Sequence, residues 1–339
     1  RGPWPSPSPI DPQRMAAAVL SPPFAEDLDF YFHVTSRYAV TLTTGWVEAA
    51  AWALRNPYPR LVSDERFGEL FAHSSMAKLF APTLDPADLT TFAPFLDDAA
   101  PGEVQGKLDF TGFAWYARAI AINGLVLTPA DSHAWALAKL FVLQGASQHM
   151  VGCHHIRLHF PPDALNATLK SLLPPGHAVR TLLEPHFRFS LPLSNSALMS
   201  TFSVLTNHQL YAYSPFVQPK DDIYRLVVRG HDGLPGNSAY PRFHFPQGFP
   251  ETPGEYGRFL KLYYDVIHTF VRPVADAVKP DDPHVAAWAD EGSKWVRGFP
   301  DARRIREPGV LADTLAYLVW NVTVAHSADH HAYGNKLPI

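Results

Sequence analysis

The stretch from Ala134 to Phe160 is apolar on nearly every side. A helix of this kind is normally covered by other elements of the fold. Asp131 or Ser132 is the expected N-cap, and Pro161-Pro162 should stop or kink the helix. The pattern therefore predicts a long central helix around which the rest of the chain packs.

Apolar positions at helical spacing recur in several other stretches. They predict helices over residues 45–55, 67–80, 86–96, 163–173, 178–187, 254–278, 283–299 and 310–329. The aromatic and β-branched residues of 109–127, around Gly112 and Gly124, predict a strand or hairpin. Residues 190–255 show no regular spacing, and we expect packed loops there. Together these patterns favour a mainly α fold with minor β structure.

The first 23 residues differ from the rest of the chain because seven of them are proline. Such a run takes extended backbone and is typical of an arm or linker. No comparable break divides residues 24–339, although 339 residues can form one large domain or two ordinary ones. We therefore expect a Pro-rich arm over 1–23 and a single helical domain over 24–339.

The composition is that of a globular protein, with 47% hydrophobic residues and a net charge of -4. This charge favours neither a nucleic acid nor an anionic membrane as a partner. No apolar run reaches the roughly 20 residues of a membrane span, and no signal peptide is visible. We expect a soluble monomer, with the cytoplasm favoured. A secreted or periplasmic location would require a signal segment removed upstream of Arg1.

Histidine is the residue type that points to chemistry, because the chain holds 17 of them. One group follows the central helix at fixed spacings: His149, His154, His159, His177 and His186. A second group near the C-terminus consists of His326, His330 and His331. The functional interpretation depends on whether these two groups meet around one metal ion.

Helical geometry decides which of these imidazoles can share a ligand. His326 and His330 are four residues apart, which places both rings on one face of a helix. His154 and His159 are five apart, which leaves them about 140° apart on a straight α-helix. A π-type turn would bring them to one side. The alternative is that one of the two is a hydrogen-bonded core histidine.

The first histidine group, with 4, 4, 17 and 8 residues between successive members, resembles the lipoxygenase motif without a gap. Similar flanking segments extend this resemblance over roughly residues 109–334. They are Trp135-Ala-Leu-Ala138-Lys139, Leu183-Glu-Pro185-His186-Phe-Arg188, Leu262-Tyr263-Tyr264, His284-Val-Ala-Ala-Trp-Ala289-Asp-Glu291, Gly298-Phe299-Pro300 and His326-Ser-Ala-Asp-His330.

The resemblance implies a metal centre with five ligands. They would be His154, His159, His326, His330 and the carboxylate of Ile339. The metal would be non-haem iron, and manganese also fits such a set. Lipoxygenases have well over a hundred residues between the late-helix ligand and the terminal isoleucine. Here His330 and Ile339 are nine residues apart.

Further residues would support these ligands. The resemblance implies that His149 lies beneath the ligands as a second layer. For His177 and His186 we favour structural hydrogen bonding. A ligating histidine usually has its other ring nitrogen fixed by a carboxylate or carbonyl, and Asp329 and Asp313 are the candidates.

The resemblance also implies a reaction, the oxygenation of a polyunsaturated fatty acid. A ferric hydroxide would take a hydrogen atom from a carbon between two cis double bonds, and O2 would then add to give a hydroperoxide. The protein would supply an apolar channel for the substrate. Met150 stands where lipoxygenases have a glutamine that connects the metal to the substrate cavity. Two alternatives therefore stay open: a four-histidine oxygenase of a smaller, non-fatty-acid molecule, and a catalytically inactive protein of this fold.

Overall fold

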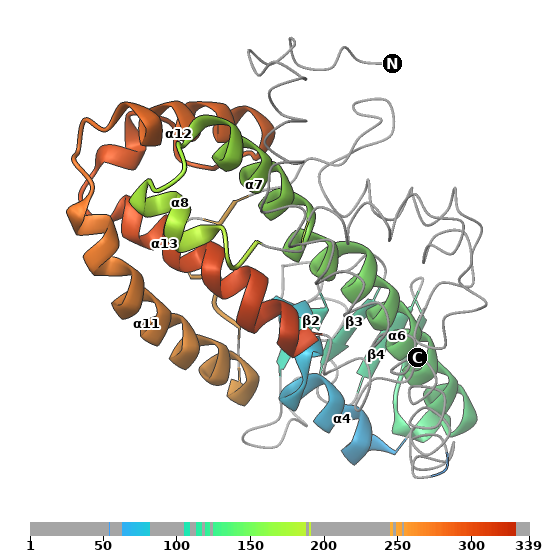
Figure 1. Cartoon of the computed structure of the whole chain (residues 1–339). Coiled ribbons are helices and arrows are strands. Elements are labelled where there is room, and N and C mark those ends of the chain that lie inside the picture. Colours follow the sequence, from blue (N-terminus) through green and yellow to red (C-terminus); the bar gives the residue numbers. More distant parts are fainter. Residues whose placement is uncertain are drawn as a thin grey trace, which may run out of the picture.

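The computed structural model describes residues 54, 63–81, 105–108, 113–116, 119–122, 125–187, 190, 245–246, 249–252 and 254–329. The Pro-rich arm, the predicted helix at 86–96 and nearly all of 45–55 and of 190–255 lie outside these residues. The division of the chain at residue 23 therefore stays a prediction. Within the described residues the fold is mainly α, as predicted (Figure 1).

A nearly continuous run of helical backbone, green in Figure 1, crosses the molecule. After the 3₁₀ turn η2 (Pro129–Asp131) it consists of α6 (His133–His149), the π turn η3 (Met150–His155), the 3₁₀ turn η4 (Ile156–Leu158) and α7 (Phe160–Leu172). This central run confirms the predicted central helix, with Ser132 at the N-cap. Pro161 and Pro162 lie in the first turn of α7, where the N–H groups have no partner inside the helix.

The C-terminal elements are α8 (Ala178–Leu183), α11 (Gly254–Ala277), α12 (Pro283–Trp295), η6 (Arg304–Arg306) and α13 (Val310–Trp320). α11 packs along α13, and α12 packs against α7 (Figure 1). Within the shared hydrophobic core, the indole of Trp288 donates to the carbonyl of Leu165 at 3.2 Å. The indole of Trp320 donates to the carbonyl of Leu260 at 3.0 Å. These bonds tie α12 to α7 and α13 to α11.

A second hydrophobic core surrounds the first half of the central run. It includes α4 (Asp64–His73) and the 3₁₀ turn η1 (Ser75–Leu79). Phe67 of α4 is buried in the same apolar cluster as Trp135 and Met150 of the central run. This packing fixes η1 close to the residues that follow α6.

The structure differs from the single helix predicted over 67–80. The α-helix ends at His73, and the chain continues as η1 and then as a strand. The hydroxyl of Ser74 accepts a hydrogen bond from the N–H of Met76 at 3.2 Å. A local side-chain bond of this kind competes with continuation of a helix, which explains the change.

The strands β1 (Phe80–Ala81), β2 (Gln105–Leu108), β3 (Phe113–Tyr116), β4 (Ala119–Ile122) and β5 (Leu125–Leu127) form one antiparallel sheet in sequence order. Trp115 lies opposite Ile120, and Ile120 lies opposite Leu127. Ile120 is fully buried and joins the sheet to the second core. The strands β3 to β5 confirm the β structure predicted over 109–127.

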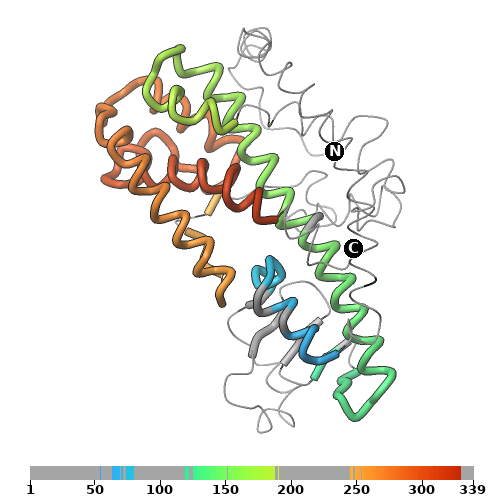
Figure 2. Tube along the Cα trace, turned by 60° about the horizontal axis from the view of Figure 1, so that its bottom comes forward, coloured from blue at the N-terminus to red at the C-terminus, as the bar shows by residue number. Residues whose placement is uncertain are grey.

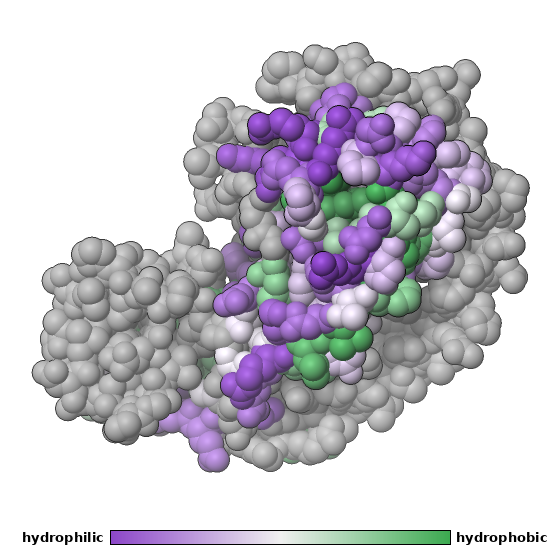
Figure 3. Space-filling view, turned by 90° about the vertical axis from the view of Figure 1, so that its left-hand side faces the viewer, coloured by the Kyte–Doolittle hydropathy of each residue, from purple (hydrophilic) through white to green (hydrophobic). Residues whose placement is uncertain are grey.

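The helix α11 lies on the outside of the bundle (Figure 2). It leaves several large apolar side chains between 45% and 63% exposed: Phe259, Leu262, Tyr263, Val266 and Phe270. Figure 3 shows hydrophobic residues among hydrophilic ones on the left-hand side of Figure 1. In the part of the chain that the structure describes, no helix has the length and apolar character needed to cross a bilayer.

Candidate metal centre

Both helices that carry candidate ligands contain a π turn. In the central run this turn is η3. After α13 the π turn η7 (Asn321–Ala325) leads into one further helical turn at 326–329. Asn321 is buried and donates to the carbonyl of Leu158 at 3.5 Å, which holds the two segments together. A π turn inserts a residue and so changes the face on which the next side chains lie.

His155, His159 and His326 form what we call the histidine cluster. The Nε2 of His159 lies 2.9 Å from the Nε2 of His326 and 3.1 Å from the Nε2 of His155. One ligand atom from each residue lies within 4.8 Å of the other two. Residues 167 positions apart in sequence are thus brought together at their ring nitrogens.

The nitrogen separations fit a shared metal ion. With metal–nitrogen bonds of about 2.1 Å, two neighbouring ligands at right angles lie about 3.0 Å apart. The two closest separations in the histidine cluster, 2.9 and 3.1 Å, match this value. Imidazole suits iron, zinc, copper and nickel alike, so the donor set fits a transition metal without selecting one.

A buried carboxylate supports the histidine cluster from behind. The Oδ2 of Asp329 lies 3.6 Å from the Nδ1 of His155, and the side chain of Asp329 is fully buried. Its Oδ1 lies 2.6 Å from the Nζ of Lys78 and accepts from the hydroxyl of Tyr256 at 3.3 Å. With Nδ1 directed at a carboxylate, the Nε2 of His155 faces the other two histidines. Asp329 was one of the two carboxylates that the sequence suggested for this role.

Burial sets the protonation of the groups at this site. It lowers the pKa of His326 to about 4, with a smaller contribution from His155. It also lowers the pKa of His154 well below the ordinary value. Burial would raise the pKa of Asp329, but Lys78 and His155 outweigh it and hold that pKa below its usual range. A neutral imidazole at His326 beside an ionised carboxylate is the form that metal binding requires.

The position of the π turn determines which of the adjacent histidines enters the cluster. The turn ends at His155, so it aligns residues five apart on its own N-terminal side. His149 and His154 meet there, with ring centroids 5.4 Å apart. Beyond the turn, His155 and His159 are four apart and share a face. A π turn, which the sequence analysis considered as a way to bring His154 and His159 to one side, is thus present, but it places the His154 ring against His149.

The other predicted site residues are placed as follows. His159 and His326 lie together in the cluster, while His330, His331 and Ile339 lie outside the described residues. The second candidate carboxylate, Asp313, instead lies 2.9 Å from the Nε2 of His268.

His177 has the structural hydrogen bonding that we favoured for it. Its Nδ1 accepts from the N–H of Val179 and so caps α8, and its Nε2 lies 3.3 Å from Asp282 at the N-cap of α12. His186 is partly buried in the turn that follows α8, and burial lowers its pKa.

Sequence reasoning missed His155, Lys78 and Tyr256. The spacing of four between His155 and His159 was visible, but it stood beside a five-residue spacing that fitted a known motif. Lys78 is 251 residues from Asp329, and no local pattern connects them.

Comparison with known proteins relates the chain distantly to lipoxygenases. Lipoxygenase 7, chloroplastic, of Oryza sativa subsp. japonica is 25% identical over 237 residues, which cover 60% of this chain and 25% of that protein. A polyunsaturated fatty acid (12S)/(13S)-lipoxygenase, epidermal-type, of Mus musculus is 23% identical over 233 residues, covering 61% of this chain and 33% of the mouse protein. The chain thus matches between a quarter and a third of the length of these relatives. No family model matches the chain.

Proposed function

We propose that this protein is a lipoxygenase-type dioxygenase that holds non-haem iron in the histidine cluster and oxygenates a polyunsaturated fatty acid. The observation that carries the proposal is the convergence of ring nitrogens from His155, His159 and His326 within 4.8 Å of one another. The similarity to lipoxygenases of rice and mouse supports the reaction class.

The proposed ligands are the histidine cluster, together with His330 and the carboxylate of Ile339 as the lipoxygenase pattern implies. His154 takes the place of His155 in that pattern. The geometry favours His155, because its Nε2 lies 3.1 Å from that of His159. Manganese is the alternative metal, because the carboxylate proposed as the fifth ligand would suit it.

Iron bound at such a site supplies one-electron chemistry toward a carbon between two double bonds and toward O2. The residues of this chain hold and orient the site. The imidazole of His326 stays neutral near pH 7 because burial keeps its pKa at about 4. Asp329 faces the Nδ1 of His155 and so directs its Nε2 to the centre. Met150 and Leu158 are both buried along the central run, on either side of His155 in sequence.

Metal analysis and oxygen uptake test the proposal. The purified full chain should contain stoichiometric iron or manganese. After iron loading it should consume O2 with linoleate or arachidonate and produce conjugated-diene absorbance. Stearate is the matched control, because it lacks a carbon between two double bonds and should give no uptake.

Each failure has its own meaning. A protein that binds neither iron nor manganese would be a catalytically inactive relative. A protein that binds iron but gives no uptake with either acid would contradict the fatty-acid substrate. The buried Met150 at the position of the lipoxygenase glutamine would then point to a different, smaller substrate.

A further inference from the structure

Lys78 connects a distant part of the chain to the histidine cluster. It belongs to η1, and its Nζ lies 2.6 Å from the Oδ1 of Asp329. The ammonium group also lies 5.6 Å from the centroid of the Tyr256 ring. Only 12% of the Lys78 side chain is exposed, so it is held between an anion and an aromatic face.

The two oxygens of Asp329 have separate partners. Oδ1 accepts from Lys78 and from the hydroxyl of Tyr256. Oδ2 faces the Nδ1 of His155 at 3.6 Å. Because Oδ1 is fixed by two donors from η1 and α11, the carboxylate has one orientation in which Oδ2 is turned toward the histidine.

We propose that Lys78 is a positioning residue for the metal centre, acting through Asp329 on His155. It holds the carboxylate so that the Nδ1 of His155 faces Oδ2 and the Nε2 lone pair faces His159 and His326. This inference rests on the proposed function, because it takes the histidine cluster as the metal site. It adds that the site is complete only when η1 is packed against the end of the last helix.

The test replaces Lys78 with methionine, which keeps the length and apolar stem but removes the charge. Lys78→Arg keeps the charge and should therefore keep most of the wild-type affinity for iron. Lys139→Met is the matched control, because Lys139 is also buried and paired with a carboxylate, Asp64, at 2.5 Å. The measurements are the dissociation constant for iron(II), by competition with a chelator, and the EPR spectrum of the ferric protein.

We expect Lys78→Met to weaken iron binding by about 10- to 100-fold, the usual effect of losing a partner behind a ligand. It should also change the rhombicity of the ferric EPR signal, because the His155 ring is no longer fixed. Lys139→Met should leave both readouts at the wild-type values, although it lowers thermal stability. Tyr256→Phe removes the second donor to Oδ1 and should weaken binding by a few fold, which provides a test if Lys78→Met does not fold.

The outcomes separate this inference from the proposed function. A wild-type protein that binds no iron overturns both. A wild-type protein that binds iron, with Lys78→Met and Tyr256→Phe unchanged in affinity and EPR signal, overturns the role of Lys78 alone. Equal loss of affinity in Lys78→Met and Lys139→Met would overturn it too, since general destabilisation would then explain the effect.

Discussion

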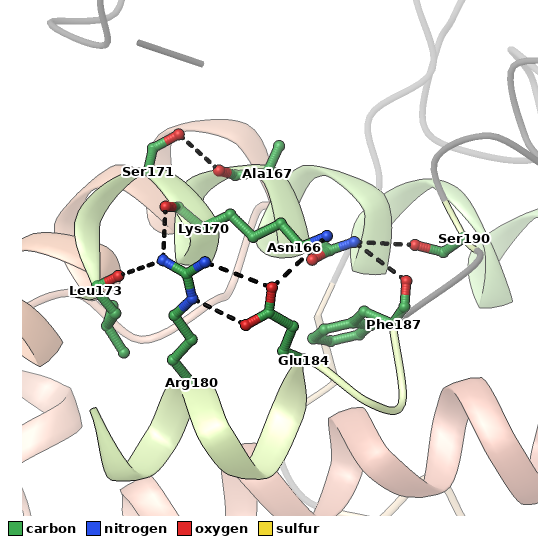
Figure 4. A network of polar contacts seen from close by, with 9 residues as sticks. All are labelled: Asn166, Ala167, Lys170, Ser171, Leu173, Arg180, Glu184, Phe187 and Ser190. Carbon is green, nitrogen blue, oxygen red and sulfur yellow. Dashed lines mark hydrogen bonds and ion pairs between the residues drawn. The ribbon is translucent and has the colours of Figure 1, made fainter. Parts of the chain in front are cut away.

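Two polar groups of this protein, both largely buried, differ in composition and in how their atoms are paired. The first is the histidine cluster. The second, which we call the Arg180 network, joins α7 to α8 (Figure 4). Arg180 donates to Glu184 at 2.9 Å and to the carbonyls of Leu173 and Lys170 at 2.9 and 3.2 Å. The ammonium of Lys170 lies 3.9 Å from the same carboxylate.

In the Arg180 network donors meet acceptors. The Arg180 guanidinium donates hydrogen bonds to carbonyls at the C-terminal end of α7, because these carbonyls have no partner inside that helix. In the histidine cluster, three ring nitrogens of one kind face one another within 4.8 Å. A neutral imidazole offers one donor and one acceptor, so these nitrogens either bond one another in matching tautomers or direct their lone pairs at a shared cation. The Arg180 network therefore pairs its charges internally, whereas the histidine cluster has three ring nitrogens that could hold a metal ion.

The largest expected effect comes from removing the histidine that touches both others. His159→Ala should abolish iron retention and oxygen uptake, because His159 contacts His155 and His326 at 3.1 and 2.9 Å. Iron content after gel filtration measures the loss. His177→Ala is the matched control: it removes a helix cap and should lower stability while the protein keeps its iron. Retained iron in His159→Ala would contradict the proposed centre.

Adjacent histidines give the sharpest test of the ligand assignment. His155→Ala should weaken iron binding by more than about 100-fold, since losing a ligand costs more than losing its support. His154→Ala should change it by less than about tenfold, because its ring lies against His149. Isothermal titration with iron(II) measures both. The reverse order would assign the ligand to His154, as the lipoxygenase spacing implies, and would place the π turn differently.

The Arg180 network should matter for folding and not for the metal. Arg180→Met leaves the partly buried Glu184 without its main partner and should lower the free energy of unfolding by about 3 kcal/mol. Urea denaturation measures this, and iron content should stay at the wild-type value. Arg272→Met is the matched control, because its pair with Asp276 is exposed and contributes about 0.5 kcal/mol or less. If Arg180→Met lost its iron, the Arg180 network would also affect the metal site, which contradicts the separation of the two groups.

Much of the fold, and two residues of the histidine cluster, could be predicted from the sequence. Helical periodicity located the central run, and the apolar patterns over 254–278 and 283–299 match α11 and α12 closely. His159 and His326 followed from motif spacing. These features are local, so short stretches of sequence are enough to reveal them.

The remainder depends on tertiary packing. A shift of one residue in the π turn exchanges His154 for His155, and a motif does not record where such a turn ends. Lys78 reaches Asp329 because Phe67 and its neighbours pack η1 against the central run. Lys78 and Asp329 are 251 residues apart in sequence, so no local periodicity could predict their contact.

The smallest expected effect is a dependence of stability on pH that the histidine cluster should show and the Arg180 network should not. Burial holds the pKa of His326 at about 4 in the folded protein, whereas a histidine in the unfolded chain has a pKa of about 6.5. As pH falls below 6.5 the unfolded state takes up the proton first, so the metal-free protein should lose stability down to about pH 4 and no further from this group. His326 should contribute at most about 1.4 kcal/mol per pH unit to this slope. His154 acts in the same direction.

Urea denaturation of the metal-free protein at pH 6.5, 5.5 and 4.5 measures this slope. His326→Gln cannot titrate and should reduce the slope to the part that other buried histidines such as His154 contribute. Arg180→Met should leave the slope between pH 6.5 and 5.5 nearly unchanged, because none of the residues drawn in Figure 4 is a histidine. If His326→Gln kept the full slope, the buried imidazole would not be the group that responds. The pH dependence of stability would then not distinguish the histidine cluster from the Arg180 network. The contrast between the two groups would rest on metal binding alone.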